Sequence, residues 1–178
     1  LQTTNQNKFI LFNEVSFSRF LSSPVRHSSN KISAAEYSKK QKLDSKAEFI
    51  KCSFKNVRSL ENGGCIETPF DLALLECSFS NSQAKQGGGV FCSNSVAVIK
   101  CAFTQCSSHE TGGAIYQDFS HVTSFDLNFS DFLSNEAKHS SAFYKKGTEK
   151  CIVSSANFTK NKASSVVAVA ELVGYKTR

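Results

Sequence analysis

The sequence predicts an all-β fold, a right-handed parallel β-helix of about five coils of about 25 residues that follow an N-terminal partial coil. Three observations support this prediction. A Phe recurs at a nearly constant interval, a pair of small residues follows each Phe, and the apolar stretches are short and alternate. The chain of 178 residues is 40% hydrophobic, which is enough for one domain with a core. No apolar run approaches the roughly 18 residues that cross a bilayer, so we expect no transmembrane span in this chain.

The repeat is clearest in three stretches, FIKCSFKNV, LLECSFSNS and VIKCAFTQC. Their aligned aromatic residues, Phe54, Phe79 and Phe103, are 25 and 24 residues apart. Phe129 and Phe158 continue the series in two weaker copies, with a longer step of 29 residues between them. We expect these five rings to stack as an aromatic ladder inside the solenoid.

Each copy predicts short strands. Ile50, Cys52 and Phe54 alternate with polar residues, and a period of two excludes a helix. The alignment then stacks Cys52, Cys77 and Cys101 in the interior, about 4.8 Å apart. We interpret the three thiols as small buried hydrophobic groups. An inter-coil disulfide fits the same spacing, whereas the absence of a CxxC pattern argues against a metal site.

The residues between these inward positions predict an outward row of alternating charge, Lys51, Glu76 and Lys100. Exposed pairs of this kind contribute about 0.2–1 kcal/mol each and mainly support the register between coils.

Small residues behind each Phe predict the turns. Gly pairs at these points suit tight corners in which the backbone adopts a positive φ. Ser pairs replace them in the last two copies. The predicted turn glycines are Gly63, Gly64, Gly87, Gly88, Gly112 and Gly113.

The chain divides into residues 1–46 and residues 47–178. The first part predicts a partial coil, a cap and a basic loop, with a short helix near residues 34–43. The second part is one continuous set of repeats. Its final apolar coil lies close to Arg178, so we expect further coils beyond Arg178 or end-to-end association with a partner.

Acidic residues near the fourth coil are the weak candidate for a cation or catalytic site. Asp118, Asp126 and Asp131, with His121 as a base, would suit the Ca²⁺-assisted chemistry of a polysaccharide lyase. We interpret them instead as turn and surface acids, because Asp126 points outward and no adjacent Asp pair occurs. We therefore expect no catalytic residue, no cofactor and no metal. The four His, at positions 27, 109, 121 and 139, are interpreted as solvated.

The chain is basic, with a net charge of +6, but seventeen of its 21 basic residues are Lys. Apart from residues 39–42 and Lys145-Lys146, they are spread along the chain. Nucleic-acid recognition favours Arg and aromatic platforms, so we expect no nucleic-acid partner and interpret the lysines as solvated.

The stretches CSFKNVRSLENGGCIE, CSFSNSQAKQGGGVFC and CAFTQCSSHETGGAIY, together with FLSN and FTKN further on, form a recurring motif over about residues 47–170. It resembles the repeats of the polymorphic outer-membrane proteins of chlamydiae, and still more those of similar β-helix repeat proteins of trichomonads and other protists. The motif departs from theirs at Val57 and Ser82, where Cys would stand, and at Gln105, where Asn would. The resemblance implies a surface or secreted protein of adhesin type.

We therefore expect a non-enzymatic protein, secreted or at the cell surface, that serves adhesion or assembly through the lateral face of its β-helix. Its partner would be a protein or a glycan. Two alternatives remain open, a carbohydrate-active β-helix of the lyase or hydrolase type and an intracellular, cytoskeletal component. Two sequons, at Asn128 and Asn157, are predicted to face outward, as glycosylation of a secreted protein requires.

Overall fold

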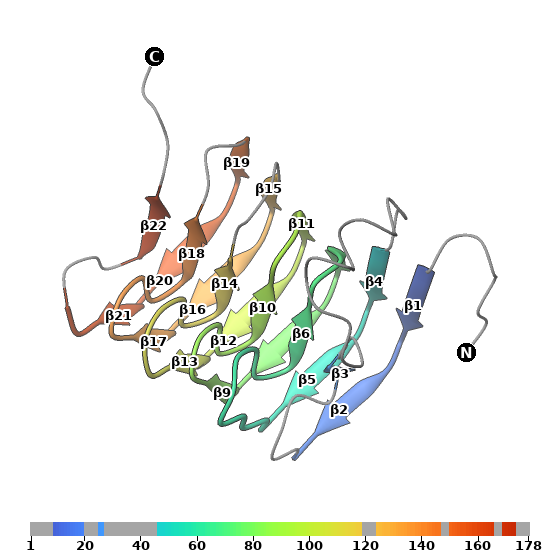
Figure 1. Ribbon diagram of the computed structural model, residues 1–178, viewed down its shortest axis with the longest axis horizontal. Helices are drawn as coiled ribbons and strands as arrows, with labels where there is room; N and C mark the ends of the chain where they lie inside the picture. The colour runs from blue at the N-terminus through green and yellow to red at the C-terminus, as the bar shows by residue number, and fades with distance from the viewer. Residues whose placement is uncertain are drawn as a thin grey trace, which may run out of the picture.

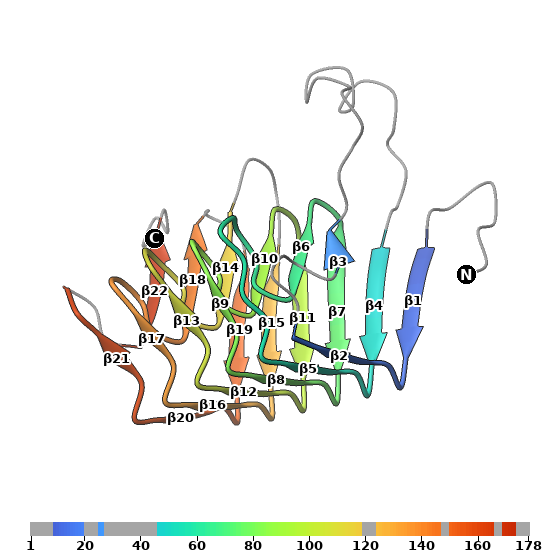
Figure 2. The ribbon, with the colours of Figure 1, turned by 90° about the horizontal axis from the view of Figure 1, so that it is seen from below.

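The computed structural model describes residues 9–19, 25–26, 46–118, 124–146, 150–165 and 169–173. In these ranges every regular element is a β-strand. The strands form four parallel sheets that wind the chain into a solenoid (Figures 1 and 2). The described part of the chain contains no helix that is long and apolar enough to cross a membrane. The prediction of an all-β parallel β-helix is confirmed.

Three of the sheets have six strands and the fourth has four. Sheet A consists of β1 (Phe9–Asn13), β4 (Lys46–Ile50), β7 (Asp71–Leu75), β11 (Val96–Ile99), β15 (Phe125–Asn128) and β19 (Cys151–Ser154). Sheet B consists of β2 (Ser16–Ser18), β5 (Ser53–Lys55), β8 (Ser78–Ser80), β12 (Ala102–Thr104), β16 (Asp131–Leu133) and β20 (Asn157–Thr159). Sheet C consists of β3 (Val25–Arg26), β6 (Ile66–Thr68), β10 (Val90–Cys92), β14 (Ile115–Gln117), β18 (Phe143–Lys146) and β22 (Ala170–Val173). Sheet D consists of β9 (Gln83–Ala84), β13 (Ser107–Ser108), β17 (Glu136–Ala137) and β21 (Lys162–Ala163).

Each turn of the solenoid, which we call a rung, passes through sheets A, B, D and C in chain order. Rung 1 comprises β1 to β3, rung 2 β4 to β6, rung 3 β7 to β10, rung 4 β11 to β14, rung 5 β15 to β18 and rung 6 β19 to β22. Rungs 3 to 6 thus contribute a strand to every sheet. In rung 2 an isolated bridge between Arg58 and Gln83 takes the place of a sheet D strand.

An aromatic ladder runs through the core along sheet B. Neighbouring rings are nearly parallel, and their centroids are 4.7 Å apart between Phe17 and Phe54, 4.8 Å between Phe54 and Phe79, and 4.6 Å between Phe79 and Phe103. Phe132 follows at 5.0 Å and Phe158 at 5.1 Å. The spacing matches the distance between paired strands, so each ring packs on its equivalent in the next rung.

The prediction that Phe129 belongs to this ladder was wrong. Phe132 pairs with Phe103, while the side chain of Phe129 is 62% exposed and its backbone has a φ of 49°. Seven residues separate β14 from β15, against three between β10 and β11. The longer connection moves the ladder position about four residues further along the chain, so Phe132 occupies it. Phe129 stands at the expected interval from Phe103 only by coincidence.

The strand predicted across residues 50–54 is two strands, β4 and β5, separated by a corner. Lys51 at this corner has a φ of 51°, a left-handed conformation that interrupts the alternation of side chains. Phe49 is therefore fully buried, while Ile50, which was expected to face inward, lies half-buried on the outer face. Its equivalent Ile99 is 37% exposed. Across the corner Cys52 is buried, so the predicted inward position of the thiol agrees with the structure.

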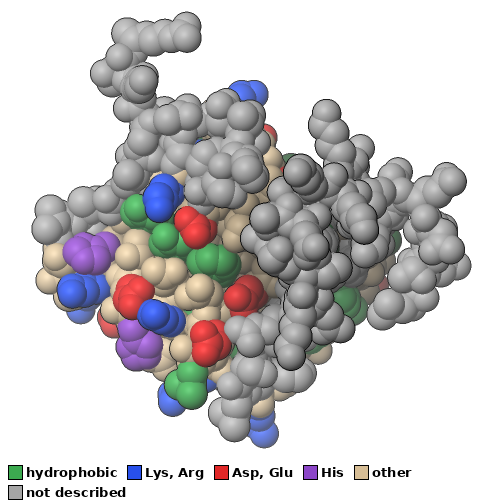
Figure 3. All heavy atoms as spheres, in the orientation of Figure 1, with side chains coloured by type: hydrophobic (Ala, Val, Ile, Leu, Met, Phe, Trp, Pro, Cys, Tyr) green, Lys and Arg blue, Asp and Glu red, His purple; other side chains and the backbone are tan. Residues whose placement is uncertain are grey.

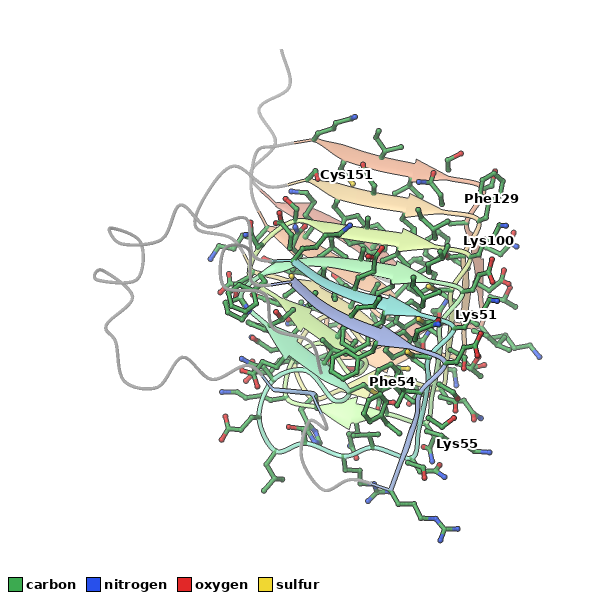
Figure 4. The ribbon with its side chains drawn as sticks, turned by 90° about the vertical axis from the view of Figure 1, so that its right-hand side faces the viewer. Lys51, Phe54, Lys55, Lys100, Phe129 and Cys151 are labelled. Atoms are coloured by element: carbon green, nitrogen blue, oxygen red, sulfur yellow. The ribbon has the colours of Figure 1, made fainter. Side chains whose placement is uncertain are left out.

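The predicted row of alternating charge lies along this corner, where Figure 4 places Lys51, Lys100 and Phe129. The Lys100 ammonium is 3.8 Å from the Glu76 carboxylate, and the Lys51 ammonium is 3.8 Å from that of Glu14. All four side chains are largely exposed, so each pair contributes little to stability.

The turn glycines meet two different requirements. Gly87, like Gly63 and Gly112, has a positive φ, here 61°. Gly88 lies against the next rung, where a Cβ atom would be only 2.2 Å from the carbonyl oxygen of Gly113. Gly64 and Gly113 are confined in the same way. In rung 5 the positive φ belongs to Ser140.

Rung 1 lies in the predicted N-terminal part and pairs in register with rung 2, Phe12 opposite Phe49 and Phe17 opposite Phe54. Residues 27–45, which include the helix predicted near residues 34–43, lie outside the described residues.

The ladder register can be tested by truncating each of the two competing Phe residues. We expect Phe132→Ala to lower the free energy of unfolding by about 3–5 kcal/mol, because it removes a fully buried ring and leaves a cavity. Phe129→Ala should cost less than about 1 kcal/mol. Urea unfolding followed by circular dichroism measures both. A larger loss for Phe129→Ala would contradict the observed register.

Candidate functional site

The three acids of the predicted cation site lie on different elements. Asp126 lies on the outer face of β15 in sheet A, Asp131 begins β16 in sheet B, and Asp118 follows β14. Asp131 accepts a hydrogen bond from the Asn157 amide at 2.8 Å. Among the described residues no three His, Cys, Asp or Glu side chains are grouped so that they could hold a metal ion. His121 lies outside the described residues.

The two sequon asparagines lie on neighbouring rungs. Asn157 begins β20 and is exposed, while Asn128 ends β15 and is half-buried. The hydroxyl of Ser130, in the first sequon, is buried and donates to the Asn128 carbonyl oxygen at 2.9 Å. Of the two, the Asn157 side chain is the more accessible for a glycan.

A groove of about 950 Å³ runs along the outer face of sheet D. It crosses rungs 3 to 6, and charged and His side chains gather near it on the lower left of the space-filling view (Figure 3). Among the described residues its lining is polar apart from two Ala, and it contains no Phe, Tyr or Trp. The lining residues are Gln83, Ser107, Ser108, His109, Glu136, Ala137, Lys138, Asn161, Lys162, Ala163 and Ser164.

Rung 4 contains one extra residue where it borders the groove. Ser108 pairs with Ala84, and Gly112 occupies the corner position that Gly87 has in rung 3. Three residues therefore lie between Ser108 and the corner, whereas two lie between Ala84 and its corner. An extra residue in a strand forms a local bulge that redirects side chains.

Polar contacts connect this bulge to rung 3. The His109 ring nitrogen Nε2 lies 3.4 Å from the Gln83 amide nitrogen. Glu110, the next residue, accepts a hydrogen bond from the Gln86 amide at 2.9 Å and forms an ion pair with Lys85 at 3.7 Å. These contacts leave the Lys85 charge compensated within the chain.

Two asparagines fix the backbone that forms the other half of the groove. The buried Asn135 accepts a hydrogen bond from the Cys106 N–H at 2.9 Å and donates to the Phe103 carbonyl oxygen at 3.0 Å. Asn161 repeats this pattern one rung later, since it accepts from the Asn135 N–H at 2.9 Å and donates to the Phe132 carbonyl oxygen at 2.9 Å. Glu136 and Lys162 follow these asparagines directly, so the backbone that carries them is held in place.

Sequence reasoning missed the groove. It treated His109 as a solvated side chain, and it gave no role to Glu136, Lys138 or Lys162. The only sequence feature that indicated the extra residue of rung 4 was the distance from the ladder Phe to the following small pair. This distance is nine residues in rung 4 and eight in rung 3. Lys145, interpreted as solvated, is instead fully buried on the inner face of β18.

The predicted thiol column exists in the core. Cys52, Cys77 and Cys101 occupy equivalent positions of rungs 2 to 4 and are almost fully buried. The Cys77 backbone nitrogen lies 3.4 Å from the Cys101 sulfur. None of the seven cysteines forms a disulfide. Only Cys151 is half-buried, and the other six are buried.

Burial and hydrogen bonds change the acidity of these thiols. Desolvation raises the pKa of Cys92 and of Cys106 to about 12, and it also raises the pKa of Cys65. A hydrogen bond between the two thiols lowers the pKa of Cys77 and raises that of Cys101. Because the sulfur of Cys77 is enclosed in the core, its lowered pKa does not make it an accessible nucleophile.

The raised pKa values predict a loss of stability in alkali. Between pH 9.0 and about pH 12 the folded chain retains the Cys92 and Cys106 protons, whereas the unfolded chain releases them. This stabilisation is fully present below pH 9.0, the value for the unfolded chain, and it falls as the pH rises towards about 12. Urea unfolding at pH 8 and pH 10.5 measures how much the free energy of unfolding falls between the two pH values. This loss should be smaller for Cys92→Ser than for the wild type, and the non-ionising control Ser78→Ala should match the wild type. An equal loss in all three proteins would contradict the role of Cys92.

No known protein family, curated protein or solved structure matches this chain. The solenoid is therefore established by the strand pairing of this chain alone. The resemblance of its repeats to surface proteins of chlamydiae and protists stays an expectation from the sequence.

Proposed function

We propose that this chain is a non-enzymatic surface or secreted repeat protein that binds an extended acidic glycan along the groove of sheet D, in adhesion or assembly. The observation that carries the proposal is the groove itself. It crosses four rungs, and paired strands present its side chains at steps of about 4.8 Å. A ligand with a regular repeat would meet equivalent backbone positions at each step.

The chemistry of the lining favours a polar, negatively charged partner. The described lining contains no Phe, Tyr or Trp and is rich in hydroxyl, amide and charged groups. Hydroxyl and amide groups, such as those of Gln83, Ser107 and Ser164, suit the hydroxyl groups of sugars. The charged groups of the lining include two exposed ammonium groups, those of Lys138 and Lys162, against one carboxylate, that of Glu136. The groove therefore suits an acidic sugar chain better than a neutral one.

A non-enzymatic role is supported by the arrangement of the carboxylate side chains in the groove. Glycoside hydrolysis usually needs two carboxyl groups, one on either side of the scissile bond, and Glu136 is the single carboxylate among the described residues that line the groove. The surface location is supported by the exposed Asn157 sequon and by the resemblance of the repeats.

Binding to immobilised acidic and neutral oligosaccharides tests the proposal. We expect binding to acidic chains that weakens as salt is added. The double variant Lys138→Ala/Lys162→Ala should lose at least about tenfold in affinity, because it removes two charge-assisted contacts. The matched control Lys51→Ala/Lys100→Ala removes the same charge from the corner between sheets A and B, and should change affinity by less than about twofold.

Three outcomes would contradict the proposal. The first is the absence of binding to any acidic chain, including the case in which only a protein partner binds. The second is an equal loss in both double variants, which would indicate attraction to net charge alone. The third is shortening of the bound glycan, measured by viscometry, which would favour the carbohydrate-active alternative.

A further inference from the structure

A smaller hollow of about 380 Å³ lies beside the groove, at the corner between sheets B and D. Its volume falls in the range of small-molecule sites. The groove and the hollow share Ser107 and Glu136 as lining residues, so the two cavities adjoin each other. The hollow spans rungs 3 to 5 and is lined by Asn81, Gln105, Cys106, Ser107, Ser134 and Glu136.

The backbone at this corner directs polar side chains into the hollow. Each rung turns the corner through a residue with a positive φ, 51° at Asn81, 53° at Gln105 and 54° at Ser134. The residue that follows, such as Cys106, is fully buried, whereas the three corner side chains are exposed or half-buried. Backbone hydrogen bonds join each corner to the next rung, so the two amides and the hydroxyl are presented at steps of about 4.8 Å.

A short side chain opens the space between these groups. Ser107 pairs with Gln83 of rung 3 and with Glu136 of rung 5, so the three side chains stand in one outward column of sheet D. The serine is much shorter than both of its neighbours. It therefore leaves a gap in the column, at the place where the hollow adjoins the groove.

The polar groups of the hollow are available to a ligand. The Asn81 amide nitrogen donates a hydrogen bond to the Asn56 side chain at 2.7 Å. Within the described residues the side chains of Gln105 and Ser134 form no hydrogen bond to another residue. A ligand can bond to both without displacing a contact of the fold.

The hollow differs from the groove in its charge. The groove contains Lys138 and Lys162, whereas the described residues that line the hollow include no Lys, Arg or His. Glu136 is the one charged group there, and it repels an anion. Amide and hydroxyl groups both donate and accept hydrogen bonds, and a carboxylate accepts them. These groups together suit the hydroxyls of an uncharged sugar.

We propose that this hollow binds one neutral sugar residue. The inference rests on the proposed function for one point, since the sugar would be a branch of the acidic chain that occupies the groove. The described lining contains no Phe, Tyr or Trp on which a sugar ring could stack, so a free sugar should bind with a Kd of about 1 mM or weaker. Attachment to a chain in the groove raises the effective concentration of the branch, so a weak site can still select branched chains.

The site can be tested without any acidic glycan, by NMR titration of the isotope-labelled chain with the methyl glycosides of glucose, galactose and mannose. At least one of them should shift the side-chain amide signals of Gln105 in a saturable manner. Added salt should leave the Kd unchanged, because the ligand is uncharged. Signals of the outer face of sheet A should not move.

Substitution of the corner residue identifies the binding groups. Gln105→Ala should raise the Kd of the methyl glycoside at least about threefold, because it removes hydrogen bonds to the sugar. The matched control Thr104→Ala removes a hydroxyl from the preceding residue, which lies outside the hollow, and should leave the Kd unchanged. Ser134→Ala provides a second test from rung 5. Circular dichroism verifies that each variant keeps its fold.

A pair of acidic probes tests the connection to the groove. A linear oligogalacturonide is compared with the same backbone bearing single xylose branches. The wild type should bind the branched chain at least about threefold more tightly. Gln105→Ala should lose this preference and keep its affinity for the linear chain.

Failure of this inference and failure of the proposed function give different results. If no methyl glycoside shifts the Gln105 signals, or if Gln105→Ala and Thr104→Ala weaken binding equally, the hollow is not a sugar site. Equal binding of linear and branched chains by the wild type would overturn the branch. If the glycosides bind as expected and no acidic chain binds, the groove proposal and the branch fail while the neutral-sugar site stands.

Discussion

The structure depends on the in-register hydrogen bonding of each rung to the next. This pairing holds neighbouring backbones about 4.8 Å apart and places every residue on its equivalent. The ring centroids of the Phe ladder repeat this distance, from 4.6 to 5.1 Å. A flat ring suits such a spacing because it can stack without displacing the backbone. The same pairing leaves no room for a Cβ atom at Gly64, Gly88 and Gly113.

The repeat and its fold could be predicted from the sequence because the first three copies have nearly equal lengths. The repeat is indicated by the regular spacing of Phe54, Phe79 and Phe103 and by the Gly pair that follows each of them. One error, the inward assignment of Ile50, arose where backbone conformation opposed the pattern. Residues with positive φ are usually Gly or Asn, so Lys51, Glu76 and Lys100 gave no sign that a corner separates two strands. Without that corner, Ile50 and Cys52 could not be assigned to different faces.

The groove could not be predicted by the same means. Its residues belong to strands of two residues each or lie next to them, and such strands are too short for a recognisable alternation. His109, Glu136 and Lys162 come from three different rungs and become neighbours only through the stacking. The ladder of Asn135 and Asn161 that supports them was visible in the sequence as a motif, but its hydrogen bonds to the backbone depend on the left-handed corner before each Asn.

The connections between strands differ in how much length they tolerate. Two residues join sheet A to sheet B in every rung, and two residues join sheet B to sheet D in rungs 3 to 6. The connection from sheet C to sheet A contains two residues after β6, seven after β14 and nineteen after β3. One flank of the solenoid thus accepts insertions without a change of register, while the corners between sheets A and B and between sheets B and D have a fixed length. New sequence can accumulate, or be introduced by design, along that single flank, while the groove of sheet D keeps its geometry.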